Sequence, residues 1–297
     1  GWVEHNPVEL IEKLNLLLNR IKEKVPYENI ISVGITNQRE SVVLWNKTTG
    51  EPIYNIIVWQ CRRTENYCNS LNKKYKETIF KKTGLCIDSY FSASKIKWII
   101  DNCKSSKKLL GQNNILCGTV DSWIIWNLTN KKEHSTDFTN ASRTMLFNIN
   151  EKKWDDELLN IFNIPKSILP IVKNSIDNFG LINNIQIPIN SVAGDQQAAL
   201  YGNGAFNASS SKCTYGTGLF FLLNTGNKRT DSKNGLLTTL ACDKNGKPIY
   251  AIEGSIFIGG ALIQWLRDSL KIINKASETE KIALYVLENI GGFNDYH

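Results

Sequence analysis

The stretch "SVAGDQQAALYGNG", residues 191–204, places one acid and two amides directly after Gly194. Aspartate is a favoured helix N-cap, because its carboxylate accepts hydrogen bonds from the unpaired amides of the first helical turn. The following "QQAALYG" therefore predicts a short helix that is capped by Asp195 and closed by Gly202. On local pattern alone we favour this capping role, and a functional role needs support from the rest of the chain.

The bulk composition predicts a globular protein. With 297 residues and 42% hydrophobic content, the chain can bury a large core in one large or two ordinary domains. Its longest apolar runs, "IIVW" (56–59) and "LFFLL" (219–223), fall far short of the roughly 20 residues that a membrane helix needs. We therefore expect no membrane span.

The net charge of +7 comes from Lys and Arg scattered along the sequence, as in "NKKYKETIFKK" (72–82). Such a pattern is typical of a solvated surface, and no zinc-finger, RNP or helix-turn-helix signature is present, so nucleic-acid binding is disfavoured. The seven cysteines form no C-x-x-C pair and indicate free thiols in a reducing compartment. With no secretory signal at the start, we expect a cytoplasmic protein. The three histidines lie far apart, so no metal site is predicted.

The order of predicted elements is mixed α and β. Hydrophobic spacing and turn residues predict helices over 7–25, 61–75, 94–103, 119–129, 154–164, 259–270 and 277–290. Strands are predicted over 29–38, 40–46, 53–60 and 213–226, and a hairpin over 236–254. Residues 165–191 read as a long loop-rich stretch with three prolines. The return to strands after "GNGAFNASSSK" (202–212) predicts a domain boundary near 204–210.

Four short clusters carry groups that suit a small polar ligand. The usual nucleotide motifs are missing, but "YGTG" (215–218) lets backbone amides approach a phosphate, and Thr217 adds a hydroxyl. In "TNQRES" (36–41), Arg39 brings donors and Glu40 brings acceptors, which together can fix adjacent hydroxyls. Trp59 ends an apolar strand and suits either the core or a pocket wall. Tyr90 stands just before a predicted helix. Each feature alone is also compatible with an ordinary turn, surface or core position.

In combination these segments resemble the FGGY carbohydrate kinases, most closely their glycerol kinase branch. The matching landmarks follow in order along nearly the whole chain: "GITNQRES" (34–41), "NIIVWQCRRT" (55–64), "YFSASKIKWIIDN" (90–102), "AGDQQAALYG" (193–202), "TYGTG" (214–218) and "GGALIQWLRD" (259–268). The resemblance implies an α/β actin-like ATPase fold, in which two ribonuclease-H-like domains close over substrate and nucleotide. It assigns 1–205 to the glycerol-binding N-terminal domain and 206–297 to the start of the nucleotide-binding C-terminal domain.

The resemblance also implies the chemistry: transfer of a phosphoryl group from ATP, with Mg²⁺, to glycerol, giving ADP and sn-glycerol 3-phosphate. The residues expected to bind the three hydroxyls of glycerol are Arg39, Glu40, Tyr90, Asp195 and Gln196. Trp59 and Phe220 would flank its carbons, and Asp195 would act as the general base. On the nucleotide side the resemblance places Thr217, Gly260 and Gln264. A carboxylate suits the role of base because phosphoryl transfer needs positioning and a proton acceptor.

Two alternatives stay open at this point. The chain could be an FGGY kinase of another small polyol or sugar, or an inactive member of the family that serves as a binding module. The sequence lacks the family's N-terminal D-x-G-T-type phosphate loop and ends before its adenine-side segment, so we expect a central fragment of a longer enzyme. The resemblance further suggests a homodimer or a higher homo-oligomer, and neither a nucleic-acid nor a membrane partner.

Overall fold

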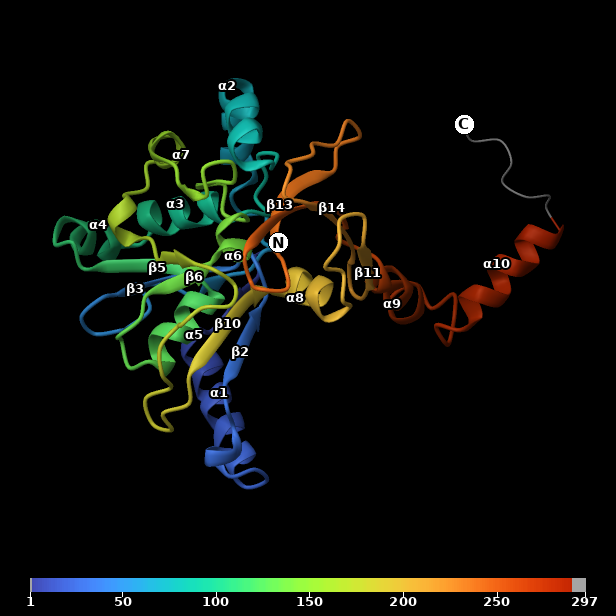
Figure 1. Cartoon of the computed structure of the whole chain (residues 1–297). Coiled ribbons are helices and arrows are strands. Elements are labelled where there is room, and N and C mark those ends of the chain that lie inside the picture. Colours follow the sequence, from blue (N-terminus) through green and yellow to red (C-terminus); the bar gives the residue numbers. More distant parts are fainter. Residues whose placement is uncertain (1, 290–297) are drawn as a thin grey trace.

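A computed structural model describes residues 2–289 as a mixed α/β chain with three main sheets (Figure 1). The first sheet has the order β1-β4-β3-β5, with bounds Glu4–His5, Ile56–Ile57, Val42–Asn46 and Ile115–Thr119. Its central strand β3 is apolar without alternation because both faces are covered. Val42 and Leu44 join one buried cluster, whereas Val43 and Trp45 join another with Trp123.

The second sheet positions the site. Strand β2 (Val33–Asn37) runs parallel to β10 (Ile189–Gly194), and the register pairs Asn37 with Gly194, so the two strands end side by side. In a parallel pair, the residues that follow both strands meet at the same edge, where ligands commonly bind. "QRE" follows β2 and "DQQ" follows β10. Arg39 and Asp195, which are 156 residues apart in sequence, are thus brought together.

The third sheet is antiparallel, in the order β11-β12-β14-β13. These strands span Ser211–Tyr215, Leu219–Gly226, Pro248–Ile256 and Leu237–Cys242. Helix α8 (Asp195–Gly202) packs on this sheet through Leu200, which joins a buried cluster with Leu222 of β12 and Ala251 of β14. The same helix therefore begins at the end of β10 and rests on the sheet formed by the later part of the chain.

The remaining elements surround these sheets. The longer helices are α1 (Pro7–Lys22), α2 (Glu65–Thr83), α3 (Ser92–Asn102), α4 (Lys104–Gly111), α5 (Val120–Leu128), α7 (Asp156–Phe162), α9 (Gly260–Asp268) and α10 (Glu278–Asn289). Shorter pieces are η1 (Tyr27–Asn29), η2 (Lys166–Ile168), α6 (Phe138–Ala141), β6 (Ser135–Asp137), β7 (Phe147–Asn148), β8 (Lys153–Trp154) and β9 (Ile171–Lys173). In Figure 1, α10 stands apart from the sheets. None of the described helices combines the length and apolarity needed to cross a membrane.

The structure corrects several expectations about these elements. The helix expected over 119–129 begins one residue later, because Thr119 is the last residue of strand β5. The polar stretch 104–111 forms helix α4. The strand expected over 53–60 shrinks to Ile56–Ile57, and the loop-rich stretch 165–191 contains β9 and the start of β10. Residue 290 of the last predicted helix lies outside the described residues.

The helix cap is also corrected. The N-cap of α8 is Gly194, and Asp195 is the first helical residue, so its carboxylate binds the neighbouring N–H of Gln196 at 2.9 Å instead of capping the next turn. An acid in the first turn is still favoured by the helix dipole. Gly194 has an ordinary extended backbone, with φ −59° and ψ 147°. A Cβ there would lie 2.6 Å from Cγ and 2.7 Å from Cδ of Arg39, so this glycine is required by space and not by conformation.

Candidate active site

The turn after β10 presents a half-exposed carboxylate. The side chain of Asp195 is 47% exposed, and its Oδ1 lies 3.4 Å from Nε of Arg39. The amide of Gln196 donates from Nε2 to Oδ2 of Asp195 at 3.3 Å. Gln196 itself is buried. The carboxylate is thus reachable from solvent while two buried neighbours hold its orientation.

Arg39 connects most of the site. Its side chain is 1% exposed and sits between β2, α8 and β14. Nη1 donates to Gln197 at 3.1 Å and to Glu253 at 2.6 Å, and Nη2 donates to the Tyr90 hydroxyl at 3.1 Å and to Glu253 at 2.9 Å. A bidentate guanidinium–carboxylate pair fixes the guanidinium plane. Nε is consequently left pointing between Asp195 and Glu40.

Arg39 belongs to a buried set of four charges that we call the arginine cluster: Arg39, Glu40, Arg143 and Glu253. Arg143 donates from Nε to Glu40 at 2.6 Å and from Nη2 to Glu253 at 2.9 Å. Burial by itself raises the pKa of Glu253, but Arg143 and Arg39 overcome that effect and hold this pKa at about 2. Burial raises the pKa of Glu40 in spite of both arginines, and repulsion from Glu253 adds to that rise. Two cations and two acids therefore balance within one closed network.

A second set of buried acids lies on the other side of the turn. In this hydroxyl cluster, Asp121 and Asp137 bind hydroxyl and amide groups, and among the described residues no cation lies within 4.0 Å of either carboxylate. Its members are Thr119, Asp121, Thr136, Asp137, Thr139 and Ser175, linked through Asn37 and Asn140. Burial raises the pKa of Asp121 to about 7 and also raises that of Asp137.

The hydroxyl cluster reaches the Asp195 turn through one residue. Thr139 donates to Asp137, with distances of 2.7 and 2.9 Å to its two oxygens, and accepts the backbone N–H of Gly194 at 2.8 Å. The carboxylate of Asp137 therefore orients the Thr139 hydroxyl, and this hydroxyl holds the backbone of Gly194, the residue before Asp195. The turn is held from one side by the arginine cluster and from the other by the hydroxyl cluster.

Aromatic rings form an apolar wall next to these polar groups. The ring of Trp59 meets those of Tyr90, Phe220 and Phe257 with centroid distances of 5.5, 6.1 and 5.8 Å. Trp59, Tyr90 and Phe257 line a cavity of about 550 Å³ together with Gln60, Arg62, Asp88 and Ile258. This cavity joins the end of the first sheet to the segment that leads into α9.

Tyr90 is fixed through its backbone as well as its hydroxyl. The ammonium of Lys95, buried in α3, donates to the carbonyls of Tyr90 and Phe91 at 2.5 and 2.9 Å. Burial lowers the pKa of Lys95 to about 7. Burial of Tyr90 raises the pKa of its phenol far above the usual range, so the phenol stays protonated and can take part in hydrogen bonds.

The glycine loop between β11 and β12 docks against the start of α9. Gly260 donates to the carbonyl of Gly216 at 2.8 Å, and Gly259 donates to that of Thr217 at 2.8 Å. A Cβ on Gly260 would lie 2.6 Å from the Gly216 oxygen, so glycine permits this close approach. Thr217 is exposed at the tip of the loop, and its hydroxyl has no partner among the described residues. Gln264 lies on the exposed part of α9, one turn further on.

The sequence-predicted residues thus fall into three places. Arg39, Tyr90, Asp195 and Gln196 are in direct contact or one residue apart, and Glu40 joins them through the arginine cluster. Trp59 and Phe220 form the aromatic wall, whereas Thr217, Gly260 and Gln264 lie on the glycine loop and α9. Their roles stay predictions.

Sequence reasoning missed five residues of this site: Gln197, Arg143, Lys212, Glu253 and Phe257. A usable signal existed for Glu253, since a lone acid inside the apolar strand "IYAIEG" is costly unless a cation meets it. Gln197 stands beside Gln196, and only the helix geometry turns it toward Arg39.

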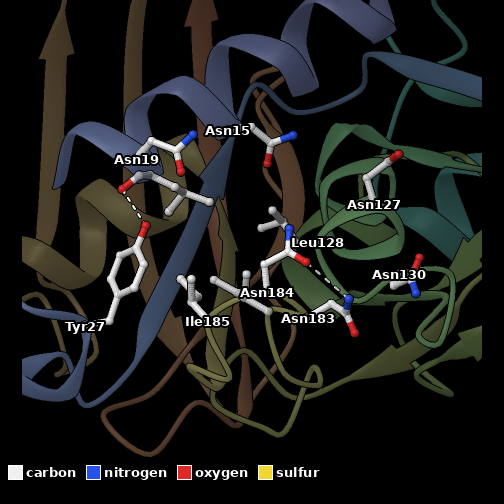
Figure 2. Close-up of a pocket in the computed structure, with 11 residues that line it drawn as sticks. Asn15, Asn19, Tyr27, Asn127, Leu128, Asn130, Asn183, Asn184 and Ile185 are labelled. Carbon is white, nitrogen blue, oxygen red and sulfur yellow. Dashed lines mark hydrogen bonds between the residues drawn. The ribbon is translucent and has the colours of Figure 1, made fainter. Parts of the chain in front are cut away.

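The described residues contain no cluster of three or more His, Cys, Asp and Glu that could hold a metal ion. A separate cavity of about 350 Å³ shares no lining residue with the site. Figure 2 shows asparagine side chains from α1, from around the end of α5 and from residues 183–184 around this cavity. Its lining carries no charged side chain, so it does not resemble a phosphate site.

The sequence of the chain matches the two domain models of one known family. Residues 1–202 match the N-terminal domain of the FGGY family of carbohydrate kinases, and residues 211–290 match the C-terminal domain of that family. The chain belongs to the FGGY family of carbohydrate kinases. This finding confirms the family on which the sequence-based expectations depend.

Curated relatives of this FGGY chain carry the name glycerol kinase. The protein of Clostridium botulinum (strain Langeland / NCTC 10281 / Type F) is 55% identical, over 98% of this chain and 60% of its own length. That of Haemophilus influenzae (strain PittGG) is 51% identical, over 98% of this chain and 59% of its own length. The chain thus spans about 60% of the length of the curated relatives that it matches.

Solved structures confirm the predicted fold class of this FGGY chain. Plasmodium falciparum glycerol kinase, crystallised with ADP, superposes with a TM-score of 0.86 at 40% identity, covering 96% of this chain and 59% of that one. A ligand-bound xylulose kinase from Lactobacillus acidophilus superposes with a TM-score of 0.81 at 20% identity, covering 96% of this chain and 58% of that one. The second likeness supports the actin-like ATPase fold alone.

Proposed function

We propose that the intact protein is a glycerol kinase that transfers a phosphoryl group from ATP to glycerol. The observation that carries the proposal is the pairing of Arg39, Asp195 and Gln196 with an aromatic wall at one strand edge. A three-carbon polyol offers hydroxyl groups on every carbon and a short apolar skeleton between them. The polar groups suit the hydroxyls and the rings suit the carbons. The names of the curated relatives agree with this substrate.

Selectivity follows from burial. Arg39 and Gln196 are buried and already turned toward the Asp195 carboxylate. A ligand lacking one hydroxyl would lose a contact with one of these buried groups, which costs more than losing a solvent-exposed contact. The preformed orientation of Arg39 also spares the ordering cost of binding.

Asp195 is our proposed general base. Its carboxylate is half exposed, so an attacking hydroxyl can reach it, while Arg39 and Gln196 fix its direction. It would accept the proton as that hydroxyl attacks the γ-phosphoryl group. Of the loop 216–218, the hydroxyl and N–H of Thr217 would be available to the phosphates, whereas the N–H of Gly216 donates to the carbonyl of Gly218 at 3.0 Å.

Mg²⁺ would accompany the nucleotide and neutralise phosphate charge. Such an ion usually keeps several waters and takes one or two carboxylates besides phosphate oxygens, so a site without a three-acid cluster suits it. The half-exposed Asp195 is the acid of this site that fits that requirement.

Glycerol-dependent release of ADP by the intact protein and by its Asp195→Asn variant tests the proposal. Asparagine keeps the size and loses the base, so we expect kcat to fall by about 10² to 10⁴-fold. Asp156→Asn is a matched control, since Asp156 is likewise the exposed first residue of a short helix, and it should keep full activity. If Asp195→Asn retained most of kcat, another residue would be the base.

A substrate screen separates glycerol from the alternatives. Wild-type protein should prefer glycerol to longer polyols and to aldose or ketose sugars by a large factor in kcat/KM. Preference for another polyol or sugar would make the protein a different FGGY kinase. No turnover with any of them, in the presence of glycerol binding, would favour an inactive member of the family.

A further inference from the structure

Lys212 of β11 is a buried cation that the proposed chemistry has not yet used. Its side chain points back under the Asp195 turn, and the residue is only 7% exposed. The ammonium donates to Oε1 of Gln196 in a short contact, to the hydroxyl of Thr214 at 2.8 Å and to the carbonyl of Phe220 at 3.2 Å. All three of its donors are thereby used.

The partners of this ammonium are neutral oxygens. Among residues 2–289, no carboxylate lies within the 4.0 Å of an ion pair with Lys212. The charged or titratable groups that face it are Arg39 after β2, Glu253 of β14, Asp195 of α8 and the adjacent Cys213. A lysine that is buried without an acid partner is costly, so its contacts need a reason beyond stability.

The contact with Gln196 settles the orientation of a side-chain amide. The two ends of a carboxamide are nearly alike in shape, and only their partners distinguish oxygen from nitrogen. An ammonium has donors and no acceptor, so of the two ends of the Gln196 amide it can donate only to Oε1. Nε2 must then point away from Lys212, and it does so toward Oδ2 of Asp195 at 3.3 Å.

We propose that Lys212 is a positioning residue that holds the Gln196 amide with its NH₂ group toward Asp195 and the substrate hydroxyl. This inference rests on the proposed function, since it deepens the description of the same polyol site. Lys212 acts through Gln196 and touches neither substrate nor phosphate in this role. Gln196 in turn offers a donor to the carboxylate of the base.

The protonation state of Lys212 controls this restraint. A neutral amine carries a lone pair that can accept from an NH₂ group, so the amide is then free to adopt either orientation. Burial lowers the pKa of Lys212 to about 8, and Arg39 adds to that effect while Glu253 and Asp195 oppose it. The restraint should therefore weaken as the pH rises through about 8.

The first experiment observes the amide in the ligand-free protein. The side-chain NH₂ resonances of ¹⁵N-labelled glutamine are recorded from pH 6.5 to 9.5, and those of Gln196 are assigned by their absence in Gln196→Ala. We expect a shift with a midpoint near pH 8 in the wild type. Lys212→Arg keeps donors only and stays protonated, so this midpoint should vanish. Resonances that ignore both pH and Lys212→Met would overturn the proposal.

The second experiment measures kinetics in the intact protein. Lys212→Met should raise KM for glycerol roughly tenfold or more, because the Gln196 amide loses the charged partner that fixes its orientation, and should leave KM for ATP nearly unchanged. Lys82→Met is the control, since Lys82 is a partly buried lysine that binds Asp155 and Glu157 instead. A loss of stability with unchanged KM for glycerol and unchanged kcat would indicate a merely structural lysine and contradict the proposal.

The two experiments separate two kinds of failure. If the intact wild-type protein does not phosphorylate glycerol, the proposed function is wrong. The amide resonances still decide the role of Lys212 in that case, because they are measured without substrate. If glycerol is phosphorylated and the Gln196 amide is indifferent to Lys212, only the positioning role is wrong.

Discussion

The arginine cluster and the hydroxyl cluster each bury two acids beside the Asp195 turn, but they stabilise them by different means. Arg39 and Arg143 balance Glu40 and Glu253 charge for charge. Asp121 and Asp137 receive only hydroxyl, amide and backbone donors. The pKa values diverge accordingly, to about 2 for Glu253 and about 7 for Asp121.

The difference separates two ways of holding the Asp195 turn. The pair with Glu253 sets the direction of Arg39, and because the pKa of Glu253 is about 2 this pair stays charged across the physiological range. Hydroxyls set the backbone at Gly194 through Thr139, and within their cluster Asp121 has a pKa of about 7. One side of the turn is thus fixed by an ion pair and the other by hydrogen bonds from hydroxyl and amide groups.

The largest expected effect comes from removing one acid of the arginine cluster. Glu253→Gln keeps the shape and leaves two buried arginines with one acid, so the free energy of unfolding should fall by about 3 to 5 kcal/mol. Glycerol affinity should fall as well, because Arg39 loses the partner that sets its plane. Chemical denaturation and calorimetric titration measure the two effects.

Glu133→Gln is the control for this variant, because Glu133 forms a partly exposed pair with Lys173. Its stability should stay close to that of the wild type. If Glu253→Gln were as stable as this control, charge balance would not be what holds the arginine cluster, and the contrast between the two clusters would collapse.

The second effect is a fall in the free energy of unfolding as the pH rises, caused by Asp121 of the hydroxyl cluster. Asp121 releases its proton near pH 4 when unfolded and near 7 when folded. Between these values the unfolded state loses a proton that the folded state keeps, so rising pH lowers the free energy of unfolding by up to about 1.4 kcal/mol per unit. Asp121→Asn should abolish this contribution, whereas Asp156→Asn should keep it. Denaturation from pH 4 to 7 measures both slopes, and identical slopes would contradict the assignment.

The smallest effect concerns the link between the hydroxyl cluster and the turn. Thr139→Val keeps the shape and leaves the N–H of Gly194 without its acceptor, which should cost about 1 to 3 kcal/mol of unfolding free energy. The kcat of the intact protein should fall too, since Asp195 directly follows Gly194 in the sequence. Thr139→Ser should restore both. A Val variant with normal kcat would show that the ion pairs alone hold the turn.

The sequence predicted most elements of the fold because their signals are local. Periodicity marked α1, and the glycine-bounded runs marked β12, β13 and β14. Strand β5 was missed because "ILCGT" passes into α5 without a Gly or Pro break between them. Helix α4 was missed because "KSSKKLLG" is mostly polar and has the composition of a surface loop.

The site was predictable only where a family motif marked it. Arg39, Tyr90 and Asp195 were found through the resemblance, and the structure places them in contact. Glu253 was not: a lone acid in an apolar strand indicates a cation partner, but that partner, Arg39, is 214 residues away and the local sequence does not identify it. The N-cap expectation for Asp195 failed by one residue, since the helix begins earlier than the polar pattern suggests.

Gly194 has a consequence for any attempt to redesign this site. Its missing Cβ is the space that Arg39 occupies, with Cγ and Cδ of the arginine 2.6 and 2.7 Å from where that atom would be. The side chains that positions 39 and 194 can carry are therefore coupled. A mutant library that varies position 194 alone would consist mainly of proteins with a displaced arginine. A library that varies both together would also sample a side chain at 194 combined with a shorter one at 39, which removes that clash.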